Sequence, residues 1–198
     1  MNIIIIKLLN KNINKKIINV FNYLGIKPII TNNKNKILNS DKVIIYSTFD
    51  IKKTIKLIKK KKLNKIIYKL KQPVLAISMG LYMLCYKYKK IKFLNIFKNI
   101  KIKKILDFNK ESKNNIGWSK VYHNNDEKLF YGLKKNYFYQ YFIHNYYITV
   151  GKYCISHTNH IISYSAVLKK NNFYGLQFNP EISGENGRKI LINFLYLI

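Results

Sequence analysis

A short apolar run, Val74–Ile77, turns at Ser78 straight into a helical segment, Leu81–Tyr88, and this junction constrains the fold most. An apolar run of this length, without alternating polar residues, is typical of a strand buried on both faces of a parallel sheet. In such sheets ligands bind beyond the carboxyl ends of the strands. The junction therefore predicts a strand–turn–helix unit with Ser78 at the end where function resides.

Three further apolar runs precede this unit and alternate with helical patterns. The predicted strands are Ile3–Ile6, Pro28–Thr31 and Val43–Ile45. Apolar residues at helical spacing predict a helix over Ile13–Leu24, with Gly25 as its C-terminal cap. The lysine-rich segment Ile51–Leu70 predicts an amphipathic helix or a helix pair. This alternation predicts an α/β fold with a doubly wound, mostly parallel sheet.

The second half of the chain is rich in β-branched and aromatic residues, which favour antiparallel strands that extend the sheet. The predicted strands are Trp118–Tyr122, Tyr137–His144, Tyr153–His157, Ser163–Leu168 and Phe173–Gln177. A turn is predicted at Gly184–Gly187 and a closing helix at Ile190–Leu197. We interpret Lys90–Ser112 as a connection that tolerates substitution. Residues 1–198 show no internal repeat and are expected to form one domain.

The formal net charge of +29 comes almost entirely from lysine, and Arg188 is the only arginine. Sequence-specific or bidentate phosphate contacts favour arginine. Lys, Asn, Ile, Tyr and Phe are over-used together, as a strongly AT-rich genome would produce. We therefore interpret the basicity as drift on solvated faces and expect no specific nucleic-acid partner, although non-specific attraction to polyanions follows from the charge.

The chain has no apolar run long enough to cross a membrane, and Ile3–Ile6 is too short for a signal peptide. Cys85 and Cys154 are isolated cysteines without the spacing of metal ligands. Cys85 lies in an apolar segment and is expected to be a small buried hydrophobe. We expect a reduced, cytoplasmic protein with no membrane contact, no metal and no cofactor.

Several segments, in order along the chain, carry a family resemblance. The elbow segment Pro73–Gly80 is followed much later by Tyr174–Glu181, which reads Tyr-Gly-Leu-Gln-Phe-Asn-Pro-Glu. Ile116–Ser119 and Phe142–Tyr146 stand between them, and Asn12 opens the first helix. This series resembles the glutaminase subunits of imidazole glycerol phosphate synthase, which are class I glutamine amidotransferases. The resemblance covers nearly the whole chain and implies that fold, with a cyclase subunit as partner.

The resemblance also implies a Cys-His-Glu triad in which a thiolate attacks the side-chain amide of glutamine. In this chain Ser78 stands at the nucleophile position and Asn179 at the base position, and only Glu181 is retained. A serine alkoxide is far harder to form than a thiolate, and an asparagine cannot accept and return a proton near neutral pH.

Two supporting elements depart from the family as well. A Pro-Gly-Val-Gly turn, whose backbone N–H groups face the developing oxyanion, is replaced here by residues that include Ser47, Thr48 and Phe49. The family's glutamine two residues past the elbow glycine is Tyr82. Oxyanion stabilisation and glutamine recognition are therefore both expected to be damaged.

Each of these positions also has an interpretation without chemistry. Ser78 fits a backbone elbow kept for packing, since Gly80 permits close helix–strand approach. We favour a structural, hydrogen-bonded role for His144 over a replacement base, and we interpret Glu181 as a leftover carboxylate or strand-end cap. For Trp118, the core and the partner interface both remain open.

The sequence predicts a degenerate glutamine amidotransferase subunit that acts in histidine biosynthesis. It would dock to the cyclase as a heterodimer through a face that includes Asn12 and Trp118, cap the cyclase channel and leave glutamine unhydrolysed. The cyclase would then run on free ammonia. Two alternatives stay open, namely a residual amidase that uses Ser78 and a repurposed basic binding module.

Overall fold

A single nine-stranded sheet organises the chain in a computed structural model that describes residues 1–7, 15–47, 51–88, 90–106, 114–124 and 126–198. The strand order is β2-β1-β3-β4-β13-β12-β11-β8-β9. The parallel strands are β1 (Ile3–Ile6), β2 (Ile29–Thr31), β3 (Lys42–Ser47), β4 (Val74–Ser78) and β13 (Phe173–Leu176). The antiparallel extension consists of β12 (Ile162–Lys170), β11 (Cys154–His160), β8 (Asn115–His123) and β9 (Tyr137–His144). The predicted α/β class is thus confirmed.

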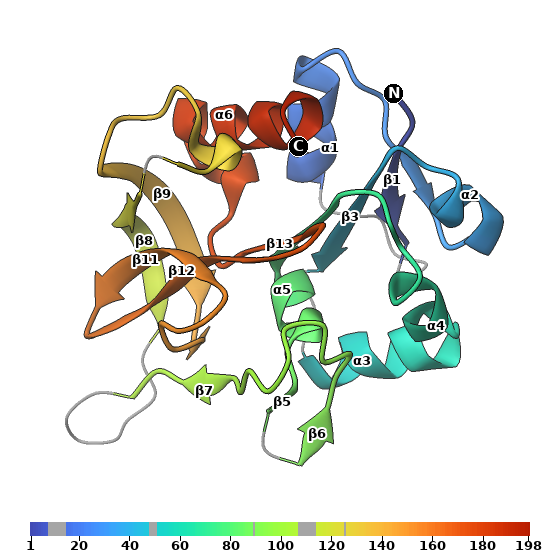
Figure 1. Ribbon diagram of the computed structural model, residues 1–198, viewed down its shortest axis with the longest axis horizontal. Coiled ribbons are helices and arrows are strands. Elements are labelled where there is room, and N and C mark those ends of the chain that lie inside the picture. Colours follow the sequence, from blue (N-terminus) through green and yellow to red (C-terminus); the bar gives the residue numbers. More distant parts are fainter. Residues whose placement is uncertain (8–14, 48–50, 89, 107–113, 125) are drawn as a thin grey trace.

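Helices cover both faces of the parallel part (Figure 1). On one side lie α1 (Lys15–Tyr23) and α6 (Gly184–Tyr196), and on the other α3 (Ile51–Lys60), α4 (Leu63–Ile67) and α5 (Met79–Leu84). Shorter elements are α2 (Lys34–Leu38), η1 (Lys128–Phe130), η2 (Pro180–Ile182), β5 (Lys87–Tyr88), β6 (Ile91–Lys92), β7 (Lys103–Lys104) and β10 (Tyr146–Tyr147). For the lysine-rich segment, predicted as one amphipathic helix or a helix pair, the structure shows the pair.

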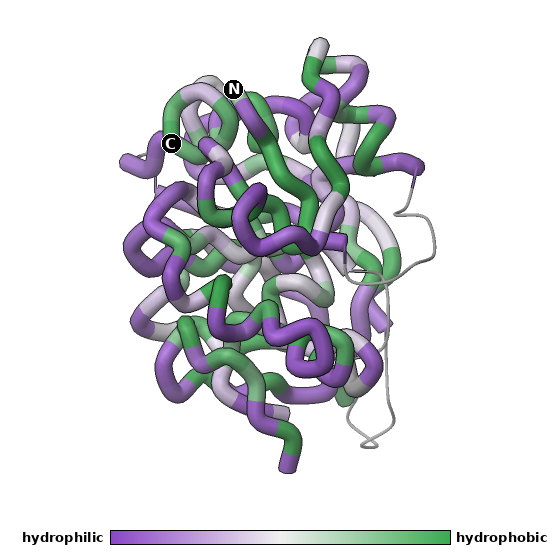
Figure 2. Tube along the Cα trace, turned by 90° about the vertical axis from the view of Figure 1, so that its right-hand side faces the viewer, coloured by the Kyte–Doolittle hydropathy of each residue, from purple (hydrophilic) through white to green (hydrophobic). Residues whose placement is uncertain are grey.

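The sheet has a hydrophobic core on each face, which explains the unbroken apolar run of β1. Ile4 and Ile6 pack into the core that includes residues of α4 and α5, whereas Ile3 and Ile5 pack into the core beneath α6. All four side chains are buried, and the strand forms one continuous hydrophobic stretch in Figure 2. A strand with two buried faces has no solvent-facing position for a polar residue.

The predicted C-terminal cap of the first helix is confirmed. Gly25 has φ +73°. Its N–H donates to the carbonyl of Asn22, and the N–H of Ile26 donates to that of Phe21, each at 2.9 Å. This pair of bonds is a Schellman motif, which a glycine adopts without steric cost.

Three predictions are wrong, two about elements and one about a connection. The helix predicted over Leu81–Tyr88 ends at Leu84, because Cys85 is extended and the chain then forms β5. Cys85 is fully buried, as predicted, and burial raises the pKa of its thiol. The turn predicted at Gly184–Gly187 is the first part of α6. A Cβ at Gly187 would lie 2.1 Å from the carbonyl oxygen of Pro180, so this glycine serves close packing.

The third error concerns Lys90–Ser112, which is not simply a tolerant connection. Within its described residues, buried side chains anchor the segment to the sheet: Phe93, Leu94, Ile96, Phe97, Ile102 and Ile105. Residues 107–112 lie outside the described part. Six buried apolar side chains in a segment of this length place it in the core, where substitutions that leave cavities are costly.

Candidate functional site: a cavity at the elbow

The backbone turns sharply at Ser78, between β4 and α5. Ser78 has φ +53° and ψ −117°, a conformation that non-glycine residues adopt rarely and at a cost. Such a strained strand-to-helix turn is the geometry of a nucleophile elbow. A Cβ at Gly80 would lie only 2.0 Å from the carbonyl oxygen of Ile45. The predicted close approach of helix and strand at Gly80 is thus confirmed.

Asn179 lies directly before η2 and is bonded to the carboxylate of Glu181. Its Nδ2 donates to Glu181 Oε1 at 2.9 Å, and the phenol of Tyr46 donates to the same oxygen at 3.0 Å. Both residues are buried. Asn179 Oδ1 and Glu181 Oε2 are buried with no hydrogen-bond partner in the described structure. The position beside the carboxylate is therefore occupied by an amide, which cannot transfer a proton.

The environment of Glu181 disfavours its charged form. Burial raises the pKa of the carboxyl group, while the hydrogen bonds from Asn179 and Tyr46 and the nearby charge of Lys16 act against this rise. Desolvation is the largest of these influences, as expected for a carboxylate taken out of water without a full ion pair.

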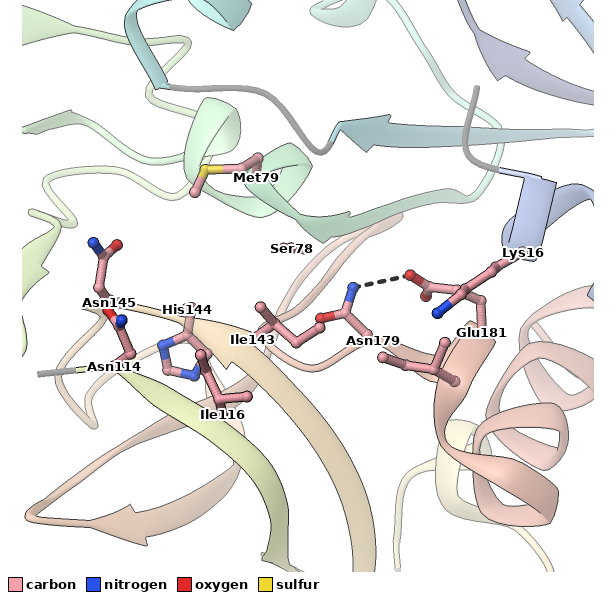
Figure 3. Close-up of a pocket in the computed structure, with 11 residues that line it drawn as sticks. Lys16, Ser78, Met79, Asn114, Ile116, Ile143, His144, Asn145, Asn179 and Glu181 are labelled. Atoms are coloured by element: carbon pink, nitrogen blue, oxygen red, sulfur yellow. Dashed lines mark hydrogen bonds between the residues drawn. The ribbon is translucent and has the colours of Figure 1, made fainter. Parts of the chain in front are cut away.

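A cavity of about 450 Å³ opens beside these groups (Figure 3). Its walls come from α1, the β4–α5 elbow, the adjoining ends of β8 and β9, and η2. The lining residues are Lys16, Ser78, Met79, Asn114, Ile116, Ile143, His144, Asn145, Asn179, Glu181 and Ile182. In Figure 3 the amide of Asn179 lies between Ser78 and Glu181, with Lys16 near the carboxylate and His144 on the opposite side. The structure therefore brings Ser78, Asn179 and Glu181 together, as predicted.

His144 is the one imidazole that lines this cavity, and it belongs to a buried hydrogen-bond chain. Its Nε2 lies 3.2 Å from the phenol oxygen of Tyr164, which accepts a bond of 2.5 Å from Asn115 Nδ2. Because Asn115 donates to this oxygen, the phenol hydrogen is available for Nε2. Burial lowers the pKa of His144 to about 4, so the ring is neutral near pH 7. The predicted hydrogen-bonded structural role is confirmed in its geometry.

Ser47 does not line the cavity. Ser47 is buried at the end of β3, and its Oγ is 3.0 Å from Oγ1 of Thr54. Thr48, Phe49 and Asn12 lie outside the described residues.

Tyr82, at the position where the family has a glutamine contact, does not line the cavity. It is fully buried; its hydroxyl donates to the carbonyl of Tyr146 at 2.8 Å and accepts a hydrogen bond from Gln177. The side chain therefore belongs to the packed interior. A motif offset identifies the helix position but not the direction of an aromatic side chain that is larger than the glutamine it replaces.

Trp118 projects from β8 with 56% of its surface exposed and packs edge-on against Tyr141. The core interpretation of this residue is therefore wrong.

Sequence reasoning missed several groups in the cavity. Lys16 stands on α1, Asn114 precedes β8 and Asn145 follows β9. Asn145 falls inside the Phe142–Tyr146 motif, so the sequence could have predicted that it lies near the site. Lys16 and Asn114 carry no motif, and only the fold brings them there.

Comparison with known proteins supplies the family. The model for "Glutamine amidotransferase class-I" matches residues 8–198. This chain belongs to the class-I glutamine amidotransferase family. It is 33% identical over 177 residues to the imidazole glycerol phosphate synthase subunit HisH of Buchnera aphidicola from Acyrthosiphon pisum, covering 88% of this chain and 89% of the relative. The HisH subunit of Bacteroides thetaiotaomicron is 34% identical over the same shares. The resemblance drawn from the motifs is thus confirmed.

Two solved structures show the same fold at lower identity. PurLQS from Thermotoga maritima aligns with a TM-score of 0.71 and 14% identity, covering 100% of this chain and 99% of the other. The glutaminase domain of Trypanosoma brucei CTPS aligns with a TM-score of 0.70 and 10% identity, covering 98% and 92%. In the described residues, no helix is long and apolar enough to span a membrane, and no cluster of three or more His, Cys, Asp or Glu could hold a metal.

Proposed function

We propose that this chain is a non-hydrolysing amidotransferase subunit of imidazole glycerol phosphate synthase, acting in histidine biosynthesis. The observation that carries the proposal is the bond from Asn179 Nδ2 to Glu181 Oε1 at 2.9 Å. An amide nitrogen that donates to the carboxylate cannot also accept the proton of a nucleophile. Glutamine hydrolysis by the family mechanism needs that transfer.

The nucleophile position supports the same proposal. The backbone of Ser78 keeps the strained elbow, but its hydroxyl has no hydrogen bond to a base among the described residues. His144 lines the same cavity, yet its Nε2 faces Tyr164 and its pKa is low. A weakly basic, already engaged imidazole is a poor acceptor for a serine proton.

The second part of the proposal is docking to the cyclase. The relatives at 33% and 34% identity are named as subunits of imidazole glycerol phosphate synthase. An exposed tryptophan beside the cavity mouth, Trp118, is the kind of aromatic anchor that interfaces bury. We propose that the chain caps the cyclase there, that Asn12 also contacts the cyclase, and that the cyclase runs on free ammonia.

A second candidate, a serine-based amidase, is favoured by one observation. The φ of Ser78, +53°, keeps the costly geometry of an elbow even though the thiol has gone. Lys16 and His144 line the same cavity and are candidates for a base. This candidate predicts hydrolysis that depends on the Ser78 hydroxyl.

Glutamate release from glutamine separates the two candidates. The purified chain is assayed alone and with a cyclase subunit from the same genome, beside the Ser78→Ala variant as a control. The proposal expects the same background rate in both proteins, because loss of a nucleophile or base in a triad costs on the order of 10⁴ to 10⁶ in rate. Release that the Ser78→Ala variant abolishes would establish the amidase instead.

A further inference from the structure

The last two strands at one edge of the sheet, β8 and β9, present a mixed apolar and basic surface. β8 and β9 pair in register, with Ile116 opposite Ile143, Trp118 opposite Tyr141 and Lys120 opposite Tyr139. Alternate side chains of β9, including Phe138 and Phe142, are buried in the core beneath α6. The opposite face carries a strip, here called the β8–β9 strip, formed by Ile116, Trp118, Lys120, Tyr137, Tyr139 and Ile143.

One end of this strip is apolar and exposed. Ile116 is 61% exposed and Ile143 47%, and both line the mouth of the elbow cavity. Trp118 follows along β8 at 56% and Tyr139 along β9 at 44%. Contiguous large apolar side chains on a monomer surface mark an interaction site, whereas isolated ones do not.

The other end is basic, and its cations are held in place by aromatic rings. Nζ of Lys120 lies 5.1 Å from the ring centre of Tyr137 and 6.0 Å from that of Tyr139. Nζ of Lys134 lies 4.4 Å from the Tyr137 ring centre and donates to its hydroxyl at 2.8 Å. Neither lysine forms an ion pair with a carboxylate in the described part of the chain.

We infer that the protein surface that covers the β8–β9 strip joins an apolar area to neighbouring carboxylates, which meet Lys120 and Lys134. The apolar area would bury Ile116, Trp118 and Ile143 and close the mouth of the elbow cavity. The inference rests on the proposed function, since it identifies this surface as that of the cyclase subunit. Beyond docking, the inference states that the cyclase surface carries negative charge there and that Lys120 and Lys134 recognise this charge.

The composition of the strip favours a protein over a nucleic acid. Protein interfaces combine aromatic and aliphatic side chains at the centre with charges at the rim. Surfaces for single-stranded nucleic acid instead line a groove with cations along the backbone path. Here the two isoleucines and Trp118 form the end at the cavity, and Lys120 and Lys134 lie over tyrosine rings at the other end.

Association kinetics with the cyclase subunit of the same genome test the inference. The variant is Lys120→Glu/Lys134→Glu, and the matched control is Lys92→Glu/Lys98→Glu, which changes the charge equally at exposed lysines on and after β6. Because complementary charges speed encounter, the strip variant should lower the association rate constant about tenfold at about 50 mM salt. The deficit should shrink to about twofold at about 500 mM salt. The control should fall by less than about twofold at both.

The outcomes separate this inference from the proposed docking. If Trp118→Ala weakens the complex but the strip variant matches its control, docking stands and the charge inference is overturned. If the unchanged chain forms no complex at micromolar concentration, both fail. Recovery of the rate by exchanging a partner carboxylate for lysine would support the pairing directly. If oligothymidylate binds the unchanged chain but not the strip variant, the strip is a nucleic-acid surface and the inference is overturned.

Discussion

The Asn179 amide donates a 2.9 Å hydrogen bond to the Glu181 carboxylate, so the retained acid of the triad is occupied by a group that cannot move a proton. Tyr46 donates to the same oxygen, which fixes the carboxylate from the β3 side. The backbone at Ser78 keeps the strained geometry of a nucleophile elbow. The residue beside it, Asn179, is not a base. The described site thus keeps the strained elbow and holds an amide beside the carboxylate.

Restoring the missing triad residues alone should not restore the activity. In the Ser78→Cys/Asn179→His variant, Glu181 is in place to orient the new imidazole, but the segment after β3 lacks the two glycines of the family turn. Loss of a single oxyanion donor costs about 10²- to 10³-fold in rate. We therefore expect glutamine hydrolysis at least about 100-fold below that of the Bacteroides thetaiotaomicron HisH subunit measured alongside. Equal rates would refute our interpretation of Ser47, Thr48 and Phe49.

The elbow should tolerate no side chain at Gly80. A Cβ there would lie 2.0 Å from a backbone oxygen, that of Ile45, so strand and helix must move apart. Overpacking costs typically about 1–3 kcal/mol, and a backbone clash belongs at the upper end. Denaturant unfolding of Gly80→Ala should show a loss of about 3 kcal/mol or more. Gly151→Ala is the control, because nothing lies within 4 Å of its Cβ. Similar curves for both would show that the approach is looser than described.

Buried His144 should make the stability depend on pH. Burial lowers its pKa from 6.5 to about 4 in the folded chain, so near pH 5 the unfolded chain binds a proton that the folded chain does not. The unfolding free energy therefore falls as pH drops from about 6.5 towards 4, by about 2 kcal/mol for this group between pH 7.5 and 5. His144→Gln should remove that part of the slope in urea titrations at the two pH values. An unchanged slope would mean that the imidazole is accessible to protons.

Trp118 should contribute to the complex and not to the fold. Truncating a central interface tryptophan often costs roughly 2 kcal/mol or more of binding free energy. Trp118→Ala should therefore weaken binding to the cyclase about 30-fold while leaving the unfolding free energy nearly unchanged, since the side chain is 56% exposed. Tyr196→Ala is the control, because Tyr196 is equally exposed on α6, which covers the other face of the sheet. Equal binding by both variants would place the partner elsewhere.

Much of the fold was predictable because burial on both faces leaves a clear mark in the sequence. The run Ile3–Ile6 has no polar position, and β9 was predicted to the residue from its aromatic content. The errors have one cause. Apolar residues are buried in helices and in extended chain alike, and glycine occurs both in turns and where helices pack closely, so neither residue type alone identifies the element. Apolar residues after Leu84 pack as extended chain, and Gly187 serves helix packing where a turn was predicted. That residues 1–198 form one domain stays a prediction.

The site was predictable only where a motif carries it. Ser78, Asn179 and Glu181 lie in segments whose order and spacing match the family, and they meet at one cavity. Lys16 reaches that cavity from α1, about sixty residues before Ser78 in the sequence, and no local sequence pattern predicts this. Tyr82 sits at the expected helix position but turns into the interior, because a large aromatic ring is stabilised by burial.

Turnover of the two-subunit complex with each nitrogen source tests the central claim most directly. The chain and the cyclase subunit of the same genome are co-purified, and formation of imidazole glycerol phosphate is followed with ammonium or with glutamine as the sole nitrogen donor. The account predicts product from ammonium and none above background from glutamine, because Asn179 leaves Ser78 without a base. Product from glutamine at a turnover near about 1 per second would contradict it.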